Sequence, residues 1–184
     1  GIDQIDCLDG PFEPHQLKGY WGNKPVLIRQ AFDADSLCQK GIWPVWSDII
    51  ELATDGSEDD DEFTSSSSAR LIQHIPGQLD SFDMRLGPFD ESVLNYLMMG
   101  SDSSDDDTDN DTDTDAKWTL VVNDVDRNVP PLADWMDQAF SFLPRWRRDD
   151  AQVSLAARHG GIGPHVDSYD VFLVQSAGQR TWQV

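Results

Sequence analysis

Apolar residues recur along the chain with two periods, and these periods predict where helices and strands form. The clearest helix begins at Pro130 and Pro131, since prolines are tolerated in a first helical turn. Its apolar face repeats every three or four residues and consists of Leu132, Trp135, Met136, Ala139, Phe140 and Leu143. Shorter helices are predicted around residues 14–21, 45–52 and 90–99.

Stretches rich in β-branched and aromatic residues predict strands. In the first part of the chain they cover residues 24–32, 70–75 and 118–125. From residue 151 the pattern changes to short strands, predicted at 151–157, 171–176 and 180–184. A helical part that leads into a run of short strands predicts an α+β chain with a β-sandwich or barrel at its end.

Two acidic, low-complexity tracts interrupt this pattern. The tract at 58–62 carries five acidic residues and the tract at 102–115 carries eight, out of 34 in a chain of net charge −21. Side chains of this kind bury little surface and repel one another, so we expect disordered insertions at about 55–68 and 100–116. The charge also disfavours direct binding to nucleic acid phosphates.

Composition indicates where the protein works. No apolar run approaches the roughly 20 residues that would span a bilayer, and no signal-peptide pattern opens the chain, so no membrane contact is expected. The two cysteines, Cys7 and Cys38, are too few for a disulfide framework, which favours a reducing compartment. We expect a soluble, intracellular protein, with the cytoplasm favoured over an organelle or the nucleus. Because the first residue is Gly1, we also expect a fragment or a processed product.

A histidine and an aspartate follow a glycine-rich turn near the end of the chain. In an extended strand, residues two apart point to the same face, so His165 and Asp167 can direct a nitrogen and an oxygen to one point. Such a pair can supply two ligands of a two-histidine, one-carboxylate iron site, which leaves positions open for a co-substrate and dioxygen. A bare His-x-Asp also occurs by chance in many chains, with the histidine at the surface or in the core. The glycines at 160, 161 and 163 allow a tight turn just before them.

The whole string "GGIGPHVDSYDVFLVQSAGQRTW", residues 160–182, resembles the metal-binding core of the JmjC-type, cupin-fold oxygenases that use Fe(II) and 2-oxoglutarate. Within that group it is most similar to the ribosomal oxygenases, in particular the bacterial type that hydroxylates a ribosomal protein arginine. "YWGNKPVLIRQAF", "GPF", "WTLVVNDVDR" and "LPRWRRDD" resemble further pieces of that family. The resemblance implies an incomplete double-stranded β-helix, with residues 1–150 as the N-terminal α/β part and 151–184 as the start of the barrel.

The resemblance also implies roles for particular side chains. It makes His165 and Asp167 iron ligands, and Arg180 the cation that holds the far carboxylate of 2-oxoglutarate. Ser154 is the candidate hydroxyl beside that carboxylate, and Tyr169 and Asp170 are candidates for binding the substrate. Beyond the metal ligands it implies no catalytic residue, and Trp182 is expected in the core.

The family's second iron-binding histidine would lie beyond Val184, since His15, His74 and His159 do not match its position. The implied function is therefore an Fe(II)- and 2-oxoglutarate-dependent hydroxylase that acts on a ribosomal protein, with arginine favoured over histidine, and that forms a homodimer at full length. These 184 residues alone are expected to be inactive. The alternatives are a non-catalytic cupin-like binding module and a cupin with another metal set.

Overall fold

The computed structural model describes residues 2–6, 13–54, 69–74, 81–101 and 117–183. Its elements form an α+β arrangement, as expected. The strands are β1 (Asp3–Asp6), β2 (Val26–Arg29), β3 (Ala69–His74), β4 (Phe82–Leu86), β5 (Trp118–Val122) and β6 (Val153–Ala156). The α-helices are α1 (Ala34–Gln39), α2 (Trp46–Thr54), α3 (Glu91–Ser101), α4 (Val125–Asn128) and α5 (Pro130–Ala139), and the 3-10 helices are η1 (Pro14–Leu17) and η2 (Arg145–Arg147).

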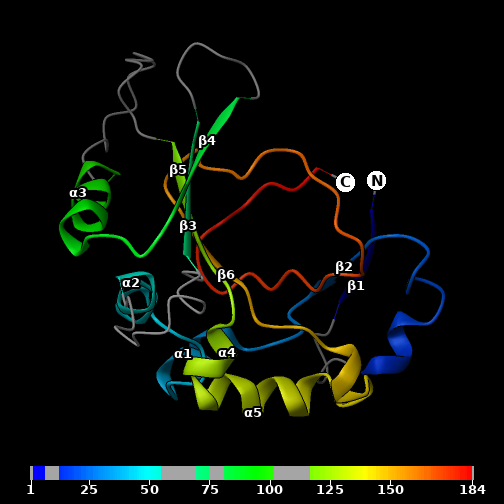
Figure 1. Ribbon diagram of the computed structural model, residues 1–184. Helices are drawn as coiled ribbons and strands as arrows, with labels where there is room; N and C mark the ends of the chain where they lie inside the picture. The colour runs from blue at the N-terminus through cyan, green and yellow to red at the C-terminus, as the bar shows by residue number, and fades with distance from the viewer. Residues whose placement is uncertain (1, 7–12, 55–68, 75–80, 102–116, 184) are drawn as a thin grey trace.

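Four strands form an antiparallel sheet in the order β4-β3-β5-β6. All five residues of β5 are buried, because β5 lies between two strands and has both faces covered. β1 and β2 form a separate parallel pair, with Asp3 opposite Val26. Figure 1 shows α2 and α3 on one side of the larger sheet, and the orange and red segment that follows β6 on the other.

The hydrophobic core lies between the larger sheet and the helices. Alternate residues of the strands face it, among them Leu71 of β3 and Leu120 of β5. Ile50 of α2, Leu94 of α3 and Leu132 of α5 pack against them. Thr119 and Val121 point to the opposite face of the sheet, and both are nevertheless buried. The second face is therefore also covered.

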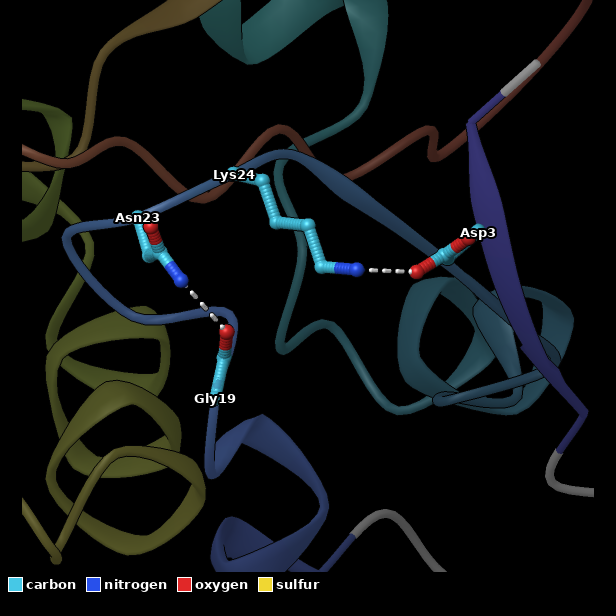
Figure 2. A network of polar contacts seen from close by, with 4 residues as sticks. All are labelled: Asp3, Gly19, Asn23 and Lys24. Atoms are coloured by element: carbon cyan, nitrogen blue, oxygen red, sulfur yellow. Dashed lines mark hydrogen bonds and ion pairs between the residues drawn. The ribbon is translucent and has the colours of Figure 1, made fainter.

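One exposed ion pair links β1 to the segment just before β2, and an amide contact lies within the turn that leads to it. Lys24 Nζ donates to Asp3 Oδ2 at 2.5 Å, and Asn23 Nδ2 donates to the carbonyl oxygen of Gly19 at 3.2 Å (Figure 2). The hydrogen bond from Lys24 lowers the pKa of Asp3, and the same bond raises the pKa of Lys24. The contact fixes β1 beside the start of β2.

Most of the predicted elements are present, with boundaries shifted by a few residues. Five elements were not predicted: β1, β4, α1, α4 and η2. β1 carries no alternating apolar pattern. β4 does alternate, with Phe82, Met84 and Leu86 apolar, but it is only five residues long and mostly exposed. α1 does carry a local signal, because the Asp33 side chain accepts a hydrogen bond from the Ser36 backbone nitrogen and so caps the helix.

The two last strands predicted from the sequence are wrong in this structure. Within the described residues 157–183 no strand forms, which removes both the strand at 171–176 and the described part of the one at 180–184. An extended apolar run becomes a strand only where a neighbouring strand completes its backbone hydrogen bonds. The predicted insertions at about 55–68 and 100–116 lie outside the described residues, except that residues 100 and 101 end α3.

In the described part of the chain, no helix has both the length and the apolar character needed to cross a membrane.

Candidate functional site

His165 and Asp167 lie in the irregular segment after β6. His165 Nε2 and Asp167 Oδ2 are 3.7 Å apart, and the two side chains are 47% and 43% exposed. No strand forms at this position, yet the two side chains approach each other. The segment therefore presents a nitrogen and an oxygen together at an accessible position.

Two glycines in the turn before this pair are required by the structure. A Cβ on Gly160 would lie 2.2 Å from the Trp118 carbonyl oxygen, so the turn can approach β5 only without a side chain. Gly163 has a φ of +76°, and a Cβ there would lie 2.8 Å from the Phe82 ring. Gly161 has open space around it. Gly160 and Gly163 thus allow the chain to pass tightly over the sheet before it reaches His165.

The hydrogen bond made by the other ring nitrogen suits His165 to metal binding. His165 Nδ1 lies 3.1 Å from the Gly163 carbonyl oxygen. A carbonyl only accepts, so Nδ1 carries the proton in this bond, and Nε2 of the neutral ring keeps a lone pair that faces Asp167. Metal-binding histidines typically donate their second nitrogen in this way.

The distance between the two donor atoms also fits a single ion. Metal bonds to imidazole nitrogen and carboxylate oxygen are about 2.0–2.2 Å long, so two donors on one ion lie at most about 4.2 Å apart. The 3.7 Å between His165 Nε2 and Asp167 Oδ2 is within that limit. One imidazole and one carboxylate form a donor set that suits a divalent transition metal such as Fe(II).

Arg180 and Ser154, both proposed to bind the co-substrate, contact each other. Arg180 Nη1 donates to Ser154 Oγ at 2.9 Å. Val153 and Leu155 pack toward the core, so Ser154 points to the opposite face of the sheet, where the segment after β6 lies (Figure 1). The guanidinium also lies 5.6 Å from the Trp182 ring centroid.

The two candidate substrate-binding residues are on the surface. Tyr169 is 65% exposed, and Asp170 is exposed beside it. Trp182 is 43% exposed, so the expectation that it lies in the core is wrong. Its ring instead faces the guanidinium of Arg180 at the surface.

The other histidines do not join His165 and Asp167. His159 has a φ of 61° and lies exposed in the turn after β6, whereas His15 is in η1 and His74 ends β3. Among the described residues, no group of three histidine, cysteine, aspartate or glutamate side chains is arranged to hold a metal ion.

Sequence reasoning missed two residues that shape this region. Phe82 of β4 lies against Gly163 and makes an edge contact with His74, with ring centroids 5.5 Å apart. Phe172 packs among the rings of Trp21, Phe140 and Phe142. Neither contact has a local sequence signal, because each joins segments that are distant in the chain.

Known proteins resemble this chain along most of its length. Residues 136–184 match the JmjC domain. The chain is 32% identical over 185 residues to a probable ribosomal oxygenase of Haemophilus influenzae, and 31% identical over 171 residues to the ribosomal protein uL16 3-hydroxylase of Escherichia coli. These alignments cover 100% and 93% of this chain. Nearly the whole chain therefore resembles ribosomal oxygenases, and its last part matches the JmjC domain.

A solved structure shows a similarity of the same kind. The ribosomal oxygenase YcfD of Escherichia coli superposes with a TM-score of 0.52 and 25% sequence identity, over 84% of this chain. The cupin-like α+β fold expected of a ribosomal oxygenase is thereby supported. The chain spans 37% and 36% of the length of the two curated relatives, and 33% of the solved YcfD chain.

Proposed function

We propose that the protein is an Fe(II)- and 2-oxoglutarate-dependent oxygenase that hydroxylates a side chain of a ribosomal protein. The observation that carries the proposal is the approach of His165 to Asp167 on the segment after β6, together with the hydrogen bond from Arg180 of the same segment to Ser154 of β6. Two relatives named for oxygenation or hydroxylation of ribosomal components align with nearly the whole chain. Together these supply a metal-donor pair, an anion-binding pair and a substrate class.

His165 and Asp167 would hold the metal, with a further ligand contributed from outside the described residues. The hydrogen bond from His165 Nδ1 to the Gly163 carbonyl fixes the ring so that Nε2 stays a donor to the metal. When bound, iron, 2-oxoglutarate and dioxygen would supply the oxidation of a C–H bond: one oxygen atom enters the substrate as a hydroxyl group, and the other enters the succinate that forms as 2-oxoglutarate loses carbon dioxide. The work of the protein is to orient these groups and to limit the access of water.

Arg180 would bind the carboxylate of 2-oxoglutarate farther from the metal. Its guanidinium donates one N–H to Ser154, which leaves other N–H groups of the planar fork for a bidentate contact. The bond to Ser154 limits the orientations that this long side chain can adopt, so less freedom is lost when the co-substrate binds.

The substrate side chain would approach past Tyr169 and Asp170. Asp170 offers an exposed carboxylate, which suits a guanidinium better than a neutral side chain, and Tyr169 offers an exposed ring against which an arginine can stack. We therefore favour arginine as the hydroxylated residue, with histidine as the second choice.

Succinate release from 2-oxoglutarate by the full-length protein tests the proposal. His165→Ala should abolish release, because one donor of the metal site is lost, whereas the matched change at an exposed histidine in η1, His15→Ala, should leave it unchanged. Arg180→Lys keeps the charge but loses the fork, and should raise the KM for 2-oxoglutarate by at least about tenfold. Undiminished turnover by His165→Ala would reject the assignment of the metal ligand.

The choice of substrate is tested separately with ribosomal protein peptides. Mass spectrometry should find a gain of one oxygen on a peptide that contains arginine, and none when that arginine is replaced by lysine. Asp170→Asn should weaken the reaction on the peptide while leaving metal binding unchanged. Hydroxylation that occurs only on histidine would overturn the preference for arginine.

A further inference from the structure

Phe172 lies inside a cage of aromatic rings. Its ring centroid is 4.7 Å from that of Phe140, 5.6 Å from that of Trp21 and 6.3 Å from that of Phe142. Phe140 caps α5 and in turn contacts Trp135 and Phe32, which pack against the core. The cage therefore joins the segment after β6 to the helical layer and to the turn that follows η1.

The segment that carries the candidate site has few other means of support. Residues 157–183 form no strand, so they lack the ladder of hydrogen bonds that holds β3, β5 and β6. Near its start the segment is held to the sheet by the hydrogen bond from Ala157 N to the Trp118 carbonyl oxygen, at 3.0 Å, and by the close approach of Gly163 to the Phe82 ring. Near its end Arg180 is hydrogen-bonded to Ser154. Phe172 provides an attachment between these two ends of the segment.

The neighbours of Phe172 in the sequence make no comparable contact. Val171, Leu173 and Val174 are all exposed, whereas Phe172 is half-buried among rings. In the apolar run 171–174, Phe172 is thus the side chain that packs inward. Aromatic pairs in such edge and tilted arrangements contribute beyond the surface that they bury.

We propose that Phe172 is a positioning residue for the site, and this inference rests on the proposed function. Phe172 lies between Asp167 and Arg180 in the chain, so fixing its ring fixes the distance and direction from the metal donors to the co-substrate cation. Phe172 itself would contact neither the metal nor 2-oxoglutarate. Its effect passes through the backbone on either side, which the Phe82 and Ser154 contacts hold only at the far ends.

The test measures binding as well as turnover. Mn(II), which favours the same oxygen and nitrogen donors, is titrated into the full-length protein with 2-oxoglutarate present and followed by electron paramagnetic resonance. Phe172→Ala should weaken Mn(II) affinity by about 10-fold or more, the loss typical when a group that orients metal ligands is removed. The KM for 2-oxoglutarate should rise in parallel. Phe172→Leu keeps an apolar anchor and should recover part of both losses.

A control separates positioning from loss of stability. Leu132→Ala removes a buried side chain of α5 that faces the core, so it should lower the unfolding temperature without moving Mn(II) affinity or KM. A Phe172→Ala protein that binds Mn(II) and 2-oxoglutarate like the wild type would overturn the inference while leaving the proposed function intact. A wild-type protein that binds neither would instead overturn the proposed function, and the inference with it.

Discussion

The four-stranded sheet and the segment that follows it differ in how they are held in place. In the sheet, β5 is buried along its whole length and hydrogen-bonded on both sides by β3 and β6. In the segment, most side chains are exposed and no strand forms within 157–183. Isolated contacts link it to the rest, among them the Ala157–Trp118 backbone hydrogen bond, the Arg180–Ser154 hydrogen bond and the ring contacts of Phe172. Stability and candidate chemistry are therefore carried by different parts of the molecule.

This difference has a physical reason. A metal site needs polar donors that an ion and a co-substrate can reach, and such groups bury little apolar surface. The sheet supplies the rigid surface, and the glycine turn brings the donors over it. Changes in the sheet should consequently affect folding, and changes in the segment should affect binding.

Removal of a core side chain should have the largest effect on stability. Leu120 is fully buried in the central strand, so Leu120→Ala should lower the free energy of unfolding by about 2 to 5 kcal/mol. Urea denaturation followed by tryptophan fluorescence measures the change. A loss below about 0.5 kcal/mol, the size usual for a surface substitution, would break the contrast between the two regions.

Gly163→Ala should have the next largest effect, since it acts where the segment meets the sheet. The alanine would have to adopt the positive φ of this position, and its methyl group would press on the Phe82 ring. We expect a loss of about 1 kcal/mol or more together with weaker metal binding. Gly161→Ala is the matched control, because nothing lies within 4 Å of its added Cβ, and it should be close to neutral in the same denaturation and titration experiments.

Asp167→Ala should separate binding from folding most cleanly. The side chain is 43% exposed, so the free energy of unfolding should change by less than about 0.5 kcal/mol, whereas calorimetric titration with Mn(II) should detect no binding. A large destabilisation would mean that the site residues also support the fold. Stability and candidate chemistry would then not be carried by different parts of the molecule.

The smallest effect is expected at the exposed pair of Asp3 and Lys24. The pKa of Asp3 is lowered on folding, so its contribution is present above the unfolded pKa and is lost as pH falls through the folded pKa. Lys24 is the reverse case: its pKa is raised, and its contribution is lost as pH rises through the folded value. Lys24→Met should raise the pKa of Asp3 toward its ordinary value in an NMR titration, and Lys18→Met should leave it unchanged.

The sequence predicted those parts of the structure that depend on local pattern. The helix from Pro130 followed from its apolar face, and the buried strand at Trp118 followed from its run of β-branched residues. The approach of His165 to Asp167 followed from their spacing. The metal and co-substrate roles of these residues and of Arg180 stay predictions.

The parts that the sequence did not predict depend on distant partners. β4 forms because β3 lies beside it, although its own residues are mostly exposed. Residues 171–176 have the composition of a strand but no neighbouring strand in the described structure. The Phe172 cage combines rings from near the start of the chain, from the end of α5 and from the segment itself. No local window contains such information.

The origin of these rings also governs the order in which the molecule can assemble. Trp21 is synthesised early, Phe140 and Phe142 much later, and Phe172 after them. The cage therefore forms only once segments that are far apart in the sequence have met. Contacts of such long sequence separation form slowly, because the entropy of closing the loop is lost before any contact is gained. The sheet can therefore fold before the segment after β6 packs against it. Metal should bind to a nearly finished protein and take no part in guiding the early steps of folding.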